Sequence, residues 1–210
     1  MGEPVMKSHI ILAALWIGWC VLHSAMITPA ATRGLEKRFG GGARFYRLLY
    51  NIVALATLIP VAGYERSIAS PAVWSWDGPF GYAQAALVAV AMTLFITGGR
   101  HYDLRRFLGL RQLGGDATGK GLTESGHIDT SGVLGVTRHP WYAGAIALLW
   151  SSDMNGARLV TNIVLTTYLI VGTYIEEKKL IAEYGDEYRE YQKRVPMLLP
   201  IGFLTSRRKG

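Results

Sequence analysis

Residues 141–175 of the chain read WYAGAIALLWSSDMNGARLVTNIVLTTYLIVGTYI. Two apolar runs, at 141–152 and 159–175, flank a short polar interruption at 153–158. A helix needs about 20 mostly apolar residues to cross the bilayer core, so the second run nearly suffices and the first is half-length. Met154-Asn155-Gly156 is rich in turn-forming residues. The stretch therefore predicts a tight helical hairpin in a membrane.

Three more apolar runs without formal charge precede the hairpin, at residues 10–27, 48–63 and 80–99. We expect the first to be a retained helix and not a signal peptide, because it exceeds the usual h-region and basic residues follow it. Half of the 210 residues are hydrophobic, which excludes a disordered chain. With a single cysteine, Cys20, a disulfide-stapled secreted domain is excluded too. The sequence predicts an all-α integral membrane protein with about five transmembrane helices and one domain, 1–210.

The basic residues are distributed unevenly along this chain of net charge +7. Of 22 Lys and Arg, 19 lie in residues 29–47, 100–140 and 176–210, and three lie in the other connections. Lys and Arg accumulate on the cytoplasmic side of membrane proteins. We therefore expect the N-terminus outside and the C-terminus in the cytoplasm, in the cytoplasmic membrane if the source is bacterial. The bilayer accounts for the charge, and a nucleic-acid partner is not expected.

Polar and glycine-rich sequence occupies the same predicted cytoplasmic side. Residues 100–140 hold many glycines, and residues 130–144 read TSGVLGVTRHPWYAG. Pro140 suits the first turn of a helix, and Gly144 allows close approach of a ligand or a neighbouring helix. An alternative is a membrane-interface cap in which Arg138 binds lipid headgroups and His139 caps the helix.

A second polar segment follows the hairpin and reads EEKKLIAEYGDEYREYQKRVPMLLP over residues 176–200. Glu176 and Glu177 are costly at the end of a membrane helix unless they are solvated or engaged. Large apolar and aromatic side chains then recur every three or four residues, at Leu180, Tyr184, Tyr188, Tyr191 and Val195. This spacing predicts an amphipathic cytoplasmic helix that lies on the bilayer or closes over a site. Pro196 ends it.

RHPWYAG, followed about 30 residues later by the 176–200 segment, resembles the isoprenylcysteine carboxyl methyltransferase and phospholipid methyltransferase superfamily. The superfamily pattern is RHPxYxG, a helical hairpin, and EExxLxxxFGxxYxxYxxxVPxxxP, with Tyr184 here in place of the Phe. The likeness covers residues 100–200, which would form the cofactor-binding part. The N-terminal half, through His23-Ser24 and Tyr46–Asn51, is similar to the bacterial methanethiol S-methyltransferases and to membrane proteins associated with nitrite and nitric-oxide reduction.

The resemblance implies methyl transfer from S-adenosylmethionine in a cytoplasm-facing pocket, without a metal. It implies that Glu176, Glu177 and His139 carry the catalytic roles. These three would also line the cofactor, together with Gly132, Val133, Val136, Arg138, Pro140, Tyr142 and Gly144. On the acceptor side it points to His23, Arg47 and Asn51, for which hydrogen bonding between helices is the alternative role.

The methyl acceptor stays open at this point. A sulfonium donor already carries its leaving group, so catalysis consists mainly of positioning, and a thiol acceptor must be a thiolate. Eukaryotic isoprenylcysteine enzymes place an Arg one turn before the Glu pair, where this chain has Gly172. A small thiol, an isoprenylcysteine carboxylate, an amine or another lipophilic molecule therefore all remain candidates.

Two other functions compete with a methyltransferase. A haem-binding membrane protein, acting as an isomerase or redox helper, would need two axial ligands at one depth. His23 lies in the first run, whereas His101, His127 and His139 lie in or beside the 100–140 connection. A non-catalytic membrane scaffold of the same fold is the third reading. The sequence leaves the oligomeric state open.

Overall fold

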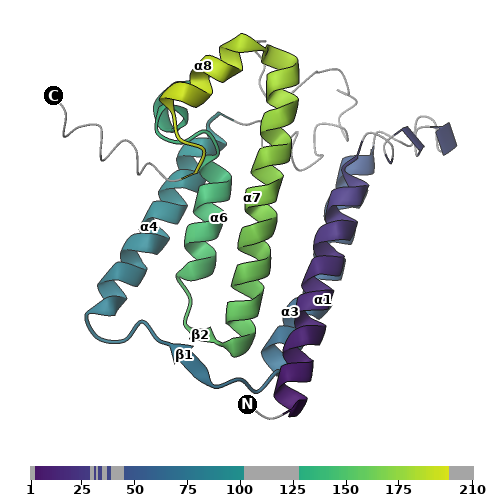
Figure 1. Ribbon diagram of the computed structural model, residues 1–210, viewed down its shortest axis with the longest axis vertical. Helices are drawn as coiled ribbons and strands as arrows, with labels where there is room; N and C mark the ends of the chain where they lie inside the picture. Colours follow the sequence, from purple (N-terminus) through teal and green to yellow (C-terminus); the bar gives the residue numbers. More distant parts are fainter. Residues whose placement is uncertain are drawn as a thin grey trace. The chain divides into compact units, whose positions relative to one another are not determined.

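A computed structural model describes residues 3–28, 31, 33–34, 37–38, 45–101 and 128–198. Most of the glycine-rich connection, residues 102–127, lies outside the described residues. The described secondary structure is almost entirely α-helical, which confirms the predicted class (Figure 1). The chain divides into two compact units. The first unit contains the chain up to Ser75 and the 153–165 segment, and the second contains the described residues from Trp76 to Ser152 and from Thr166 onward.

The first unit is built on α1 (Glu3–Met26), α3 (Tyr46–Ser67) and the start of α7 (Gly156–Tyr184). α1 and α3 run side by side in Figure 1. Leu12, Trp16, Val61 and Ala157 form the buried centre. The Trp16 indole donates a hydrogen bond to Thr161 Oγ1 at 2.7 Å, so its polar edge is satisfied inside the apolar core.

The second unit packs α4 (Phe80–Gly99) against α6 (Pro140–Trp150). Glycines allow this close approach. A Cβ on Gly98 would lie 2.7 Å from Cδ1 of Trp141, and a Cβ on Gly144 would lie 3.2 Å from the Ala91 carbonyl oxygen. Helices in membranes associate through such small residues, because lipid offers no hydrophobic drive for helix pairing.

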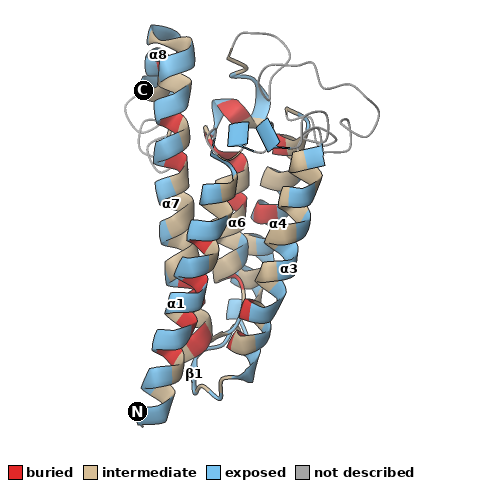
Figure 2. Cartoon of the chain, turned by 90° about the vertical axis from the view of Figure 1, so that its right-hand side faces the viewer, coloured by how far each residue is buried: buried red, intermediate tan, exposed pale blue. Residues whose placement is uncertain are grey.

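Four helices, α1, α3, α4 and α7, are long and apolar enough to cross a membrane. Many of their aliphatic side chains are exposed. Only a small part of each helix is buried (Figure 2). In water such apolar surface would be unfavourable, whereas lipid solvates it. The remaining predicted helix, the half-length run at 141–152, corresponds to α6. It has 11 residues and is about 16 Å long, about half the thickness of the bilayer core.

The predicted turn between the last two apolar runs also contains a strand. Met154–Asn155 (β2) pairs antiparallel with Ala72–Trp74 (β1), which the sequence analysis did not predict. Asn155 Oδ1 accepts a hydrogen bond from the Arg158 backbone N–H at 2.8 Å and caps the start of α7. Arg158 also forms an ion pair with the buried Glu65 at 3.1 Å.

The C-terminal amphipathic helix is divided in two. α7 continues through the Glu pair to Tyr184, and α8 (Asp186–Arg194) turns back across its end (Figure 1). Gly185 between them has φ = +58°, a conformation that side chains with a Cβ rarely adopt. Tyr188, Tyr191 and Val195 are buried against partly buried Leu180, Ile181 and Tyr184. The three- and four-residue spacing therefore predicted the packed face correctly, although the helix is interrupted at Gly185.

Candidate functional site

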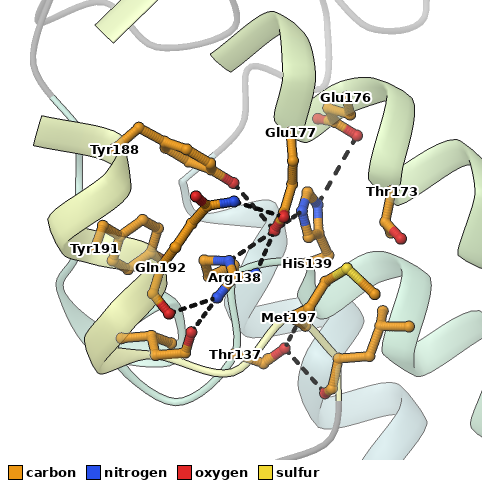
Figure 3. Close-up of polar contacts among 12 residues, drawn as sticks. Thr137, Arg138, His139, Thr173, Glu176, Glu177, Tyr188, Tyr191, Gln192 and Met197 are labelled. Carbon is orange, nitrogen blue, oxygen red and sulfur yellow. Dashed lines mark hydrogen bonds and ion pairs between the residues drawn. The ribbon is translucent and has the colours of Figure 1, made fainter. Parts of the chain in front are cut away.

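Glu177 lies at the centre of a polar network in the second unit (Figure 3). Its Oε1 accepts hydrogen bonds from Arg138 Nε at 2.7 Å and from His139 Nε2 at 3.2 Å. From α8, Tyr188 donates to Oε1 at 3.4 Å and Gln192 donates to Oε2 at 2.8 Å. The side chain is only 8% exposed. A buried carboxylate this fully paired acts as a structural anchor, because its acceptor positions are already in use.

Arg138 is engaged at every nitrogen of its guanidinium. Besides the Nε bond, its Nη2 lies 2.6 Å from Glu177 Oε1. Its Nη1 donates to the carbonyls of Gln192, at 3.1 Å, and Val195. Arg138 thus joins α7 to the end of α8 with a side chain 8% exposed. The interface-cap alternative, with this guanidinium on lipid headgroups, does not fit these contacts.

The chain after α8 runs along the residues that precede α6. The backbone N–H groups of Arg138 and His139 donate to the carbonyls of Pro196, at 3.0 Å, and Met197, at 3.2 Å. The Thr137 hydroxyl donates to the carbonyls of Met197 and Leu198 at 3.1 and 3.0 Å. We call residues 196–198 the C-terminal strap. The strap holds His139 in place from the backbone side.

His139 lies between the two glutamates and is 3% exposed. Burial lowers the pKa of its imidazole, against the opposing pull of Glu176 and Glu177. The ring is therefore neutral near pH 7, with Nε2–H directed to Glu177 and Nδ1 as an acceptor. Nδ1 lies 3.9 Å from Oε2 of Glu176, beyond hydrogen-bond distance. Glu176 is 31% exposed and makes no hydrogen bond to any described residue.

The structure brings together many of the predicted cofactor residues in one unit. Arg138, His139, Glu176 and Glu177 are in direct contact or face one another, and the Tyr142 ring meets His139 edge-on at 5.6 Å. Gly132 and Val133 lie in a short 3-10 helix, η3 (Gly132–Gly135), with Val136 directly after it. The Tyr191 hydroxyl ties η3 to α8 by donating to the Leu134 carbonyl at 2.6 Å.

Other predicted residues lie elsewhere. Pro140 and Gly144 pack against α4. A Cβ on Gly98 would lie 3.2 Å from Pro140 Cγ, and a Cβ on Gly144 would lie 3.2 Å from the Ala91 carbonyl oxygen. His23 belongs to the first unit, where its Nε2 is 2.6 Å from the Tyr50 hydroxyl and its ring stacks on Trp19. Arg47 and Asn51 lie on the first turns of α3 in the same unit. These three remain predictions for the acceptor side.

Four residues of the network were not singled out as site residues from sequence: Thr137, Tyr188, Gln192 and Met197. Burial, followed by the charge of Glu177, raises the pKa of the Tyr188 hydroxyl, which therefore stays protonated as a donor. One signal was available, because Gln192 lies four residues after Tyr188 and so on the same face of a helix. Among the described residues, no group of three His, Cys, Asp or Glu side chains is arranged to hold a metal.

Known proteins similar to this chain include one family model and several bacterial relatives that share one name. A family model described as NnrU protein matches residues 11–198. A Mycobacterium tuberculosis protein named methanethiol S-methyltransferase is 37% identical, over 95% of this chain and 80% of its own length. Methanethiol S-methyltransferase 2 of Bradyrhizobium diazoefficiens is 28% identical, over 99% of this chain and 77% of its own.

A methanethiol S-methyltransferase of a Pseudomonas species is 31% identical over 64% of this chain, and the match spans about half (52%) of that protein. No solved structure matches the chain.

Proposed function

The chain belongs to the NnrU protein family, and on that premise we propose that it is an integral membrane methyltransferase that transfers a methyl group from S-adenosylmethionine to a small thiol. Three relatives that match most of this chain are named as methanethiol S-methyltransferases. The RHPWYAG motif and the Glu pair agree with the wider isoprenylcysteine methyltransferase-like group. Four apolar helices fit a membrane location.

The facing acceptors of His139 and Glu176 support the cofactor most directly. Two acceptor atoms, Nδ1 and Oε2, lie 3.9 Å apart with no donor between them among the described residues. A group with at least two N–H or O–H bonds would satisfy both at once. The α-ammonium of a methionine moiety and a ribose hydroxyl both have such chemistry, and an ammonium gains a charge-assisted bond to Glu176.

The two glutamates then have different roles. Glu176 would hold the cofactor, while Glu177 and Arg138 keep His139 and the start of α6 in position. When bound, the cofactor supplies an activated methyl group on a positively charged sulfur. The residues of this chain supply orientation, which is the main requirement of a displacement whose leaving group is already built in.

The charges around the site favour a thiol over a carboxylate acceptor. A carboxylate acceptor needs a cation beside it, and the cation in this network, Arg138, is fully engaged by Glu177 and backbone carbonyls. At Gly172 the neighbouring space holds the Tyr142 ring, because a Cβ there would lie 3.4 Å from Cε1. A neutral small thiol requires no such partner.

The site would open to the cytoplasm, where a polar cofactor is available. The bilayer core takes about 20 helical residues. If the span of α7 begins at Gly156, Glu176 follows directly after it. The uneven distribution of Lys and Arg supports a cytoplasmic location for this end of α7.

The test combines binding with methyl transfer. Purified protein in lipid nanodiscs is titrated calorimetrically with S-adenosylmethionine and then assayed for conversion of methanethiol to dimethyl sulfide. Glu176→Gln should weaken cofactor binding about 10- to 100-fold, the cost of losing one hydrogen bond to a charged group. Glu183→Gln, an exposed position on the same helix, is the matched control and should bind normally. No cofactor binding by the wild type would overturn the proposal.

A further inference from the structure

A second histidine-carboxylate pair lies in the same unit, outside the Glu177 network. His101 follows the last turn of α4, and its Nδ1 lies 2.6 Å from Oδ2 of Asp129. The other oxygen, Oδ1, accepts hydrogen bonds from the Ser131 backbone N–H at 2.9 Å and the Ser131 hydroxyl at 2.7 Å. The pair fixes one tautomer, in which Nδ1 carries the proton and Nε2 is an acceptor.

The carboxylate of this pair is ionised at neutral pH. Hydrogen bonds from the backbone and hydroxyl of Ser131, and then from His101, lower the pKa of Asp129 to about 2. Among the described residues, the charged neighbours of His101 are Asp129 across the contact and exposed Arg100 beside it in the chain. The η3 helix, which packs against α4, carries no titratable side chain.

The acceptor nitrogen faces Gly132, one of the residues that the sequence predicts to line the cofactor. A Cβ on Gly132 would lie 3.2 Å from His101 Nε2, so this atom meets the bare backbone at the start of η3, where φ is +55°. Six residues later the chain reaches Arg138 and then His139. Gly98, one turn before His101, contacts Pro140 and Trp141 at the start of α6.

His101 has the features of a base, and His139 does not. Among the described residues, Nε2 of His101 makes no hydrogen bond, and the side chain is 16% exposed, with Asp129 at 37%. His139 is nearly fully buried, with Nε2 directed to Glu177 and Nδ1 facing Glu176. A carboxylate on Nδ1–H with a free Nε2 is the arrangement that orients an imidazole as a general base.

We propose that His101, oriented by Asp129, accepts the proton of the thiol substrate. In this step the S–H bond breaks, the proton passes to Nε2, and the electron pair stays on sulfur. The resulting thiolate is the nucleophile that methyl transfer requires. The imidazolium then returns its proton to water. This inference rests on the proposed function and adds the base that the Glu177 network lacks.

The first experiment reads thiol ionisation without turnover. 4-Methylthiophenol, whose thiolate absorbs at longer wavelength than the thiol, is added to cofactor-free protein near neutral pH, just below its own pKa, where a histidine can still accept a proton. The wild type should increase the thiolate fraction, and His101→Gln should not. Gln still donates a hydrogen bond to Asp129 but is not a base. His9→Gln is the matched control, because His9 is hydrogen-bonded to Ser70 at 2.9 Å in the other unit, and it should behave as wild type.

The second experiment compares thiols of different acidity during methyl transfer. With an alkanethiol at pH 7, His101→Gln should lose about 100-fold in rate, within the usual contribution of general-base catalysis. With 4-nitrothiophenol, which is fully ionised at pH 7, the loss should shrink to within about fivefold. Asp129→Asn should show the same trend more weakly, and it serves as the test if His101→Gln does not fold. Retained S-adenosylmethionine binding shows folding.

The outcomes separate the two proposals. Suppose that the wild type methylates thiols, but His101→Gln is equally slowed for every thiol or ionises 4-methylthiophenol as the wild type does. That result overturns the role of His101 as a base and leaves the proposed function intact. A wild type that methylates no thiol overturns the proposed function and this inference with it. Selective rescue by acidic thiols supports both.

Discussion

Neighbouring glutamates on α7 have very different surroundings. Glu177 accepts hydrogen bonds from side chains of α8 and of the segment before α6. Glu176 makes no hydrogen bond to a described residue, and its Oε2 lies 3.9 Å from His139 Nδ1. A one-residue step along a helix rotates the side chain by about 100°. The motif therefore places one carboxylate in the protein interior and leaves the other partly exposed, where the proposed cofactor would meet it.

The Glu177→Gln substitution should destabilise the protein by about 3 kcal/mol. It leaves Arg138 buried without its counter-charge, which is the usual cost of breaking a buried ion pair. Thermal unfolding in nanodiscs measures the effect, with Glu176→Gln as the adjacent control that should change stability little. Equal melting temperatures for Glu177→Gln and wild type would contradict the anchoring role.

Acid should destabilise the protein through His139. Burial lowers the pKa of this imidazole in the folded state below its ordinary value, so the unfolded chain binds the proton more readily. Stability is then fully present above about pH 6.5 and falls as the pH drops below it. His139→Gln removes this titration and should flatten the melting temperature between pH 7.5 and pH 5. An unchanged slope would assign the acid sensitivity to other groups.

At the level of helices, α4 and α6 depend on glycine contacts. A Cβ on Gly98 would overlap the Trp141 ring of α6, and a Cβ on Gly144 would lie unusually close to the Ala91 carbonyl oxygen of α4. The start of α6 carries His139 as its N-cap residue, so the α4–α6 contact also positions the site.

Gly98→Ala should cost about 1–3 kcal/mol, because its Cβ would overlap Trp141 in a packed interface. Gly63→Ala on α3 is the matched control, since no atom outside its own helix lies within 4 Å of its Cβ position. Melting temperatures of the two variants are compared under identical conditions. Equal effects would show that general helix propensity, and not this contact, determines the result.

Sequence patterns predicted the helices well and their partners less well. Hydrophobic runs located α4 at its observed bounds and α3 within a few residues, because lipid demands long apolar stretches. The run at 10–27 missed the first turns of α1, which begins at Glu3. The overrun of α7 and the β1–β2 pairing were not predicted. The first depends on packing of α8, and the second joins segments about 80 residues apart that no local period encodes.

The site shows the same division. RHP and the Glu pair were predicted from their motifs. Gln192 and the C-terminal strap were not, because the strap meets Thr137 and Arg138 from about 60 residues away through backbone carbonyls. Backbone contacts leave little trace in residue identity.

For the whole molecule, the charge distribution predicts the orientation in the membrane. A cysteine placed at position 3 should react with a membrane-impermeant maleimide added outside intact cells, and a cysteine at position 190 should react only after lysis. Each is introduced into a Cys20→Ser background that retains activity. The reverse pattern would invert the orientation and place the proposed site outside.

The strap also determines when the site comes into being. Arg138, His139 and Glu177 contact one another and take further partners from residues 188–198. A ribosome-bound chain that has inserted every membrane helix still lacks those partners. The proposed cofactor site would therefore be completed late in biosynthesis, and a nonsense codon near position 190 should leave an inserted polypeptide that lacks it. Synthesis of residues 188–198 is therefore required before the site can assemble.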